Sequence, residues 1–251
     1  MLKLFSLCVI LLGLPGLQGV AHTPVTVMFK YDHVDVKSWT AVEAYLQQNN
    51  IRSEEVADLT FFKCDLTELP DWVCEKMPNL KLLNIRYNKF KKIPETIAHL
   101  TKLTNIAAGN NELTEFPSFL SKLPALHSVD FRGNRLKNIS KSSLNLPNLT
   151  FLILSHNQIG TLPDLSGLES LQVLRLEHNE DIRFGTQSKP LDSLNSLDLS
   201  HCNLKTVPSI VGTFSKLRNF NLAGNPLLEK GSGDKWGKDE LKQHFADKVR
   251  F

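Results

Sequence analysis

Apolar residues recur along this chain at fixed offsets from residue 56 onward. Each copy places three apolar residues in the spacing φ-x-x-φ-x-φ, followed three positions later by an Asn or Cys anchor and then by another apolar residue. A further apolar residue and a proline usually close the copy. The eight anchors, spaced 22 to 24 residues apart, are Cys64, Asn88, Asn111, Asn134, Asn157, Asn179, Cys202 and Asn225. Spacing this regular indicates a tandem structural repeat.

The centre of each copy alternates apolar and variable residues with period two, which predicts one short strand per repeat with its apolar residues on one face. One copy cannot bury that face alone, but stacked copies can. Parallel strands about 4.8 Å apart predict a sheet about 35–40 Å across for eight repeats. The anchor Asn should turn inward and satisfy backbone groups at the bend after the strand. Cys64 and Cys202 occupy the same slot, where a buried thiol is accepted.

The motif and its period resemble the leucine-rich-repeat family over roughly two-thirds of the chain. The resemblance implies an α/β solenoid, a horseshoe with a parallel sheet on its concave side. The closing segment Pro94–Ile97–Leu100 resembles the branch of the family with short convex helices or 3₁₀ turns. Secreted members often carry cysteine-rich caps at both ends. This chain lacks them, which sets it apart from vertebrate extracellular receptors and matrix proteoglycans.

Residues 1–21 have the three parts of a secretory signal peptide. Lys3 gives a positive start, Leu4 to Leu14 is an almost unbroken apolar run, and small residues precede a cleavage point after Ala21, with Gly19 as the next choice. The alternative is a buried N-terminal helix. The apolar run is too short to cross a bilayer, and no other stretch approaches that length. We therefore expect a secreted, extracellular protein without a transmembrane segment.

The segments around the repeats (residues 56–228) are predicted to cap the exposed ends of the core. Residues 22–55 form the N-terminal cap, with a strand from Val25 to Tyr31 and a helix that begins after an N-capping Ser38 and runs to about Asn49. Residues 229–251 form the C-terminal cap, with a short helix over Asp239–Ala246 and an edge strand containing Val249 and Phe251. The copy from Asn179 to Leu194 lacks the proline closure and predicts a looser loop.

Charge and cysteine content narrow the function further. The net charge of +3, from 29 basic and 26 acidic residues, is too balanced for a nucleic-acid partner. Beyond the signal segment lie three cysteines, so that at most one intramolecular disulfide forms; Cys64 and Cys74 are either that disulfide or two buried thiols. Two sequons, at Asn138 and Asn148, are predicted glycosylation sites in a secretory pathway.

No catalytic motif is present: the sequence has no phosphate-binding loop, no G-x-S-x-G and no H-E-x-x-H. The chain is therefore not expected to be an enzyme or to hold a cofactor. His156, His178 and His201 precede the anchors of consecutive repeats, and stacking would bring them together as a metal site requires. Ser-His-Asn is nevertheless a common filling of the family pattern, and this second interpretation is favoured.

The variable strand positions point away from the core and form a grid on the concave face. Most are small or polar, but Phe151, Ile153 and Val173 predict an apolar patch over two neighbouring repeats. An apolar patch with a charged rim is typical of the centre of a protein interface. The rim residues are Arg132, Arg175 and Glu177, and a second candidate patch near the N-terminus contains Phe62, Leu82, Arg86 and Tyr87.

The sequence thus favours a secreted, non-enzymatic recognition protein that binds a protein or glycoconjugate partner through its concave face. The resemblance adds innate immunity or host–parasite contact as settings for such a protein. Two alternatives stay open, an intracellular signalling scaffold with similar proline-closed repeats and a secreted inhibitor of a foreign enzyme. The sequence does not specify the oligomeric state.

Overall fold

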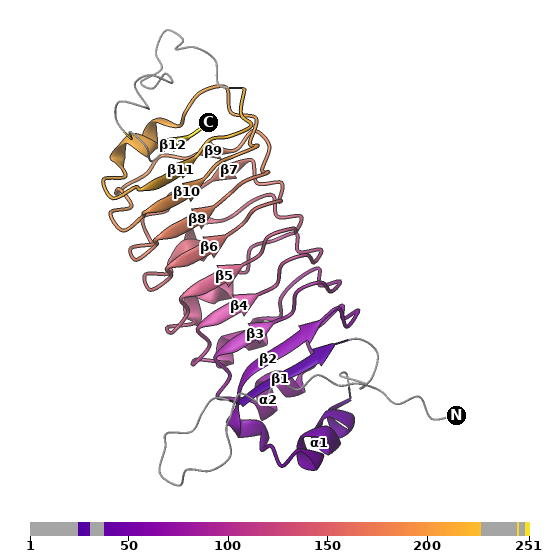
Figure 1. The fold of residues 1–251 in the computed structure, drawn as a ribbon. Helices are drawn as coiled ribbons and strands as arrows, with labels where there is room; N and C mark the ends of the chain where they lie inside the picture. Colours follow the sequence, from indigo (N-terminus) through magenta and orange to yellow (C-terminus); the bar gives the residue numbers. More distant parts are fainter. Residues whose placement is uncertain (1–24, 31–37, 227–244, 246–248) are drawn as a thin grey trace.

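A single parallel sheet of ten strands runs through this computed structural model, which describes residues 25–30, 38–226, 245 and 249–251 (Figure 1). The strand order is β1-β2-β3-β4-β5-β6-β8-β10-β11-β12, so that each repeat pairs with the next along the chain. The strands are β1 (Val25–Lys30), β2 (Val56–Phe62), β3 (Leu82–Asn84), β4 (Asn105–Ala107), β5 (Ser128–Asp130), β6 (Phe151–Ile153), β8 (Val173–Arg175), β10 (Ser196–Asp198), β11 (Asn219–Asn221) and β12 (Val249–Arg250). The predicted parallel solenoid is confirmed.

The repeat length sets the register of this sheet. The central residue of each strand pairs with the central residue of the next, as Leu83 with Ile106 and Leu152 with Leu174. These side chains are fully or almost fully buried, and they form one continuous core with the leucines of the loops. Because side chains alternate along a strand, the residues on either side of each central residue project from the concave face in straight columns.

The anchor asparagines hold the turns after the strands, as predicted. The Oδ1 atom of Asn157 accepts a hydrogen bond from the Leu136 amide at 3.0 Å, one repeat earlier. Its Nδ2 atom donates to the carbonyls of Phe131 at 3.0 Å and Leu154 at 2.9 Å. The other anchor asparagines make the same contacts: Oδ1 accepts from a backbone N–H of the preceding repeat, and Nδ2 donates to one carbonyl in each of the two repeats. They are Asn88, Asn111, Asn134, Asn179 and Asn225. A buried side-chain ladder therefore joins successive repeats.

The two cysteine anchors modify the turn. The Cys202 thiol lies 3.3 Å from the carbonyl oxygen of Leu176, which matches the contact made by an anchor asparagine. The residue after each cysteine anchor has a positive φ, 52° at Asp65 and 54° at Asn203, a conformation that the residues after the asparagine anchors do not share. Asp and Asn tolerate this left-handed conformation better than other side chains. The polypeptide thus accommodates the cysteine anchors by a different turn.

Short 3₁₀ turns form the convex side of most repeats, which agrees with the prediction from the closing prolines (Figure 1). The two copies that follow Asn157 and Asn179 have no 3₁₀ turn, and they contain a two-stranded parallel sheet on the lateral side, formed by β7 (Thr161–Leu162) and β9 (Arg183–Phe184). The convex and connecting elements are η1 (Ser53–Glu55), α2 (Trp72–Lys76), η2 (Glu95–His99), η3 (Ser118–Lys122), η4 (Lys141–Leu144) and η5 (Ser209–Thr213). The departure predicted for the copy after Asn179 is therefore a change in secondary structure.

The two ends of the sheet are covered by elements outside the repeat pattern. Helix α1 (Trp39–Gln48) buries Val42, Tyr45 and Leu46, while Ser38 sits at its N-cap position without a capping hydrogen bond from its side chain. At the other end, β12 extends the sheet, and Phe245 packs edge-on against Phe220 with ring centroids 5.5 Å apart. The predicted signal peptide, residues 1–21, and most of the predicted helix Asp239–Ala246 lie outside the described residues.

Candidate functional site

The predicted apolar patch lies in the middle of the concave face. Phe151 pairs with Val173 across β6 and β8, and the register places Ile153 beside Arg175. Phe151 is 43% exposed, whereas Ile153 and Val173 are half-buried. The structure therefore brings these three residues together, with the phenylalanine ring as the exposed member.

Polar groups that lack partners border this patch. Ser155 lies two residues after Ile153, and Glu177 occupies the equivalent position one repeat later. The Ser155 Oγ and one carboxylate oxygen of Glu177, Oε2, are enclosed by protein and have no hydrogen-bond partner among the described residues. The other carboxylate oxygen, Oε1, lies 4.0 Å from the Arg175 guanidinium. Buried polar groups without partners are destabilising, so this spot favours rearrangement around a hydrogen-bond donor.

The remaining rim residue, Arg132, belongs to a separate ion cluster. Its Nε atom contacts both carboxylate oxygens of Asp130, at 2.9 and 3.0 Å. Arg86 reaches across two repeats to the same carboxylate, past the repeat in between, where the small Ala107 and Gly109, which has no side chain, leave room for it. Burial alone would raise the pKa of Asp130, but hydrogen bonds from Arg132 and Arg86 outweigh burial and lower that pKa. This cluster is largely satisfied internally.

The second candidate patch is a compact aromatic group at the N-terminal end. The Phe62 and Tyr87 rings meet edge-on with centroids 5.0 Å apart, and the Lys63 ammonium lies 5.7 and 5.5 Å from them. Arg86 points away from this pair, toward Asp130. The structure thus keeps Phe62 and Tyr87 together and assigns Arg86 to the ion cluster.

The three histidines form a stack on the surface of consecutive turns. The His156 and His178 rings are 4.2 Å apart and the His178 and His201 rings 4.6 Å apart, nearly parallel in both pairs. Burial lowers the pKa of His178, and its two histidine neighbours lower it further. No cluster of three or more metal-ligating side chains occurs in the part of the chain that the structure describes.

Of the two alternatives for Cys64 and Cys74, a disulfide or two thiols, the structure has separate thiols. Cys64 occupies the ladder slot with its sulfur 3.7 Å from the Phe62 carbonyl oxygen, so its backbone position is fixed by the repeat. Burial raises the pKa of the Cys74 thiol. The sequon residues Asn138 and Asn148 are both exposed, and Asn148 donates a hydrogen bond to the Pro124 carbonyl.

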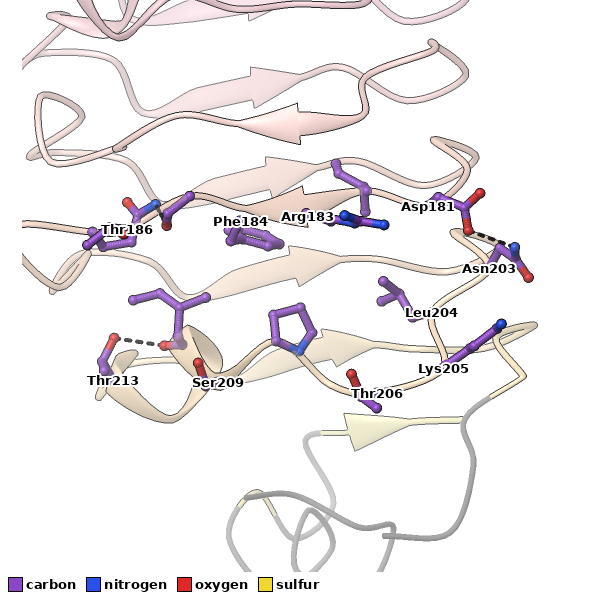
Figure 2. Close-up of a pocket in the computed structure, with 15 residues that line it drawn as sticks. Asp181, Arg183, Phe184, Thr186, Asn203, Leu204, Lys205, Thr206, Ser209 and Thr213 are labelled. Carbon is purple, nitrogen blue, oxygen red and sulfur yellow. Dashed lines mark hydrogen bonds between the residues drawn. The ribbon is translucent and has the colours of Figure 1, made fainter. Parts of the chain in front are cut away.

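A groove that the sequence did not predict opens on the lateral side, between β9 and the following repeat (Figure 2). Its volume is about 790 Å³. Figure 2 shows Arg183, Phe184 and Thr186 along one wall and Leu204 and Thr206 along the other. The sequence indicated only an irregular loop here, since the strand β9 is two residues long and its pairing depends on distant residues.

Family models for leucine-rich repeats match residues 124–180 and, in a second model, residues 79–100 and 193–214. Together with the parallel solenoid, these matches establish that the chain is a leucine-rich-repeat protein. No helix within the described residues is long and apolar enough to cross a membrane.

Individual relatives are similar over parts of the chain. Tsukushi from Xenopus tropicalis is 45% identical over 69 residues, which cover 27% of this chain and 19% of Tsukushi. The leucine-rich-repeat domain of APL1B has a TM-score of 0.61 at 20% identity, covering 85% of this chain and 66% of that structure. A leucine-rich-repeat protein of Leptospira interrogans has a TM-score of 0.49 at 18% identity, covering 79% of this chain and 67% of that one. The likeness to APL1B concerns the fold.

Proposed function

We propose that this chain is a secreted, non-enzymatic recognition protein that binds a protein partner through the middle of its concave face. The observation that supports this most directly is Phe151, a large apolar side chain that is 43% exposed on a largely polar sheet face. Exposed aromatic residues with half-buried apolar neighbours are enriched at the energetic centres of interfaces. Leucine-rich-repeat domains generally bind proteins.

The polar border of the patch suggests the chemistry of the partner. Glu177 and Ser155, two residues beyond Arg175 and Ile153, hold enclosed oxygen atoms without hydrogen bonds, which a partner reaches when the side chains at this border shift. A lysine or arginine of the partner suits this surface, because its apolar stem can contact the patch while the donors at its tip bind the oxygen atoms. Arg132 contributes less than the sequence suggested, since Asp130 holds its guanidinium.

The binding face is tested by replacing Phe151 with a photo-crosslinking phenylalanine analogue and identifying the extracellular protein that becomes attached. The affinity of this partner is then measured for Phe151→Ala and Arg175→Ala. Each variant should bind about fivefold more weakly or worse, which corresponds to a loss of about 1 kcal/mol or more. Lys137→Ala, an exposed lysine outside the concave columns, serves as the control and should bind like the unmodified protein. Unchanged affinity in both patch variants would refute the assignment.

Secretion is tested separately by intact mass and N-terminal sequencing of protein from the medium of secretory eukaryotic cells. Cleavage after Ala21 or Gly19, with glycan on Asn138 or Asn148, supports an extracellular role. A product retained in the cytosol with residues 1–21 intact would instead make the signalling scaffold the leading function. Inhibition of a foreign enzyme and recognition of a glycoconjugate remain alternatives for the same face, and the crosslinking experiment distinguishes them by the molecule attached.

A further inference from the structure

A second ladder of backbone pairing runs along the lateral side of the solenoid. Its members lie four residues after successive anchors: Glu115 bridges to Asn138, Asn138 bridges to Thr161, and Thr161 pairs with Arg183. The next residue in the series, Thr206, takes no part in any strand or bridge. The lateral ladder therefore ends at β9, and the groove of about 790 Å³ begins at its open edge.

The hydrogen bonds of β9 show which of its backbone groups face the groove. The amides of Arg183 and Gly185 donate to the carbonyls of Gly160 and Leu162, at 2.9 and 2.8 Å, on the side of β7. In a parallel ladder, alternate residues direct both their N–H and C=O groups to the same side. The N–H and C=O groups of Phe184 therefore point away from β7, and no described residue bonds to them. An open edge of this kind is a template for another strand.

The groove walls provide apolar and charged surfaces beside that edge. Phe184 and Ile210 are half-buried and pack against the core, so they offer apolar surface to an occupant. Asp181 is held by the Asn203 side chain at 2.8 Å. Arg183 and Lys205 are exposed and form no ion pair with any described residue. The charged lining residues are therefore two cations and one carboxylate, that of Asp181, and their net charge is positive (Figure 2).

We propose that this groove binds an extended acidic peptide segment of a partner protein, which adds a strand to the free edge of β9. The peptide backbone pairs with Phe184, an apolar side chain of the peptide contacts Phe184 and Ile210, and a neighbouring carboxylate binds Arg183 and Lys205. Strand addition of this type takes its affinity from main-chain hydrogen bonds and its specificity from pockets for alternate side chains. The groove lies on the lateral side, so this binding is independent of the concave face.

A phage library of linear nine-residue peptides, selected on the full secreted protein, tests the proposal. Selection should enrich peptides in which Asp or Glu lies next to β-branched or aromatic residues. The enriched peptides are then synthesised with a fluorescent label, and their affinities are measured. The double variant Arg183→Glu/Lys205→Glu should bind at least tenfold more weakly. The matched control, Lys189→Glu/Lys216→Glu, makes the same change in net charge outside the groove and should bind within twofold of the original protein.

Backbone methylation of the peptide distinguishes strand addition from any other mode of binding. Alternate amides of a peptide strand point to opposite sides, and only one set faces β9. N-methylation of the amides that face β9 should abolish binding, whereas N-methylation of the other set should leave the affinity unchanged. Thr206→Trp, which fills the groove without changing charge, should also abolish binding, and circular dichroism establishes that each variant is folded. Failure to enrich any peptide, equal affinity for the groove variant and its control, or indifference to methylation would each overturn the proposal.

Discussion

Substitution of an anchor asparagine provides the sharpest test of what holds the repeats together. Asn157 is 7% exposed and is the hydrogen-bond acceptor of the Leu136 amide. Its Nδ2 atom also donates to the carbonyls of Phe131 and Leu154, which accept a second hydrogen bond from Asn134 and Asn179 respectively. Asn157→Ala therefore leaves the Leu136 amide without a partner and removes one of two donors from each carbonyl. An orphaned buried backbone group costs about 1–3 kcal/mol. Each of the two lost carbonyl hydrogen bonds adds about 0.5–1.5 kcal/mol. Because the space vacated by the amide group can admit water, we expect a total loss near the low end of the sum, about 2–3 kcal/mol.

Urea denaturation followed by circular dichroism measures this loss as a fall in the transition midpoint at constant slope. Gln158→Ala, an exposed neighbour of the same turn, is the control and should change the free energy of unfolding by less than about 0.5 kcal/mol. Asn157→Cys should fall between the two, because Cys202 fills the equivalent slot and its thiol contacts the carbonyls but is a weak acceptor. A loss below about 1 kcal/mol for Asn157→Ala would refute the ladder as a major source of stability.

Three further substitutions test electrostatics and backbone strain. The pKa of Asp130 is lowered in the folded state, so its contribution to stability is complete above about pH 4 and is lost as the pH falls through the folded pKa. In urea titrations, Asp130→Asn should therefore lower the free energy of unfolding by about 2–4 kcal/mol at pH 7 and by less at pH 3, and an equal loss at both pH values would contradict this. The pKa of His178 is also lowered, so below about pH 6.5 the unfolded chain binds the proton more readily than the folded protein and stability falls. His178→Asn should reduce the drop in melting temperature between pH 7.5 and 5.5, whereas an unchanged drop would count against a lowered pKa in the histidine stack. Gly133 has a φ of 64°, and a Cβ atom there would lie 2.5 Å from the Asn110 side-chain oxygen, so Gly133→Ala should lower the free energy of unfolding by about 1 kcal/mol or more. The control Gly160→Ala, where nothing lies within 4 Å of the added Cβ, should change it little, and equal melting temperatures for the two variants would show that this strain is absent.

The sequence was sufficient to predict the sheet, the ladder and the placement of the apolar patch, because all three follow from a fixed repeat. A constant spacing keeps the register, and the register alone brings Phe151 beside Val173. The residue before each anchor illustrates the same point: its φ is positive in all eight repeats although its identity varies. These residues and their φ values are Lys63 at 57°, Tyr87 at 58°, Asn110 at 56°, Gly133 at 64°, His156 at 54°, His178 at 58°, His201 at 53° and Gly224 at 69°.

Features that depend on long side chains or on the end of a ladder could not be predicted in this way. The period of the repeat fixes backbone positions, but Arg86 spans two repeats to reach Asp130, and that choice depends on the small residues in between. Likewise, the enclosed oxygen atoms of Ser155 and Glu177 follow from how neighbouring side chains fill the concave surface. The repeat pattern predicts where Arg132 lies on the concave face, and so it placed this residue on the patch rim. The pattern does not predict that its guanidinium pairs with Asp130.

The lateral groove lies beside a departure in the buried ladder. In a regular repeat, the amide two residues after an anchor donates to the Oδ1 atom of the next anchor, as Leu136 does to Asn157. Cys202 has no such oxygen, and the corresponding amide, that of Asp181, donates instead to the main-chain carbonyl of Cys202 at 2.9 Å, with φ of 57° at Asp181. The chain therefore enters β9 along a different path from the other repeats, still paired with β7 but separated from Thr206. Cys64 has no such effect, because it begins the ladder and no earlier repeat needs its acceptor. The change of hydrogen-bond partner at the Cys202 anchor and the end of the lateral ladder at β9 thus fall at the same place in the solenoid.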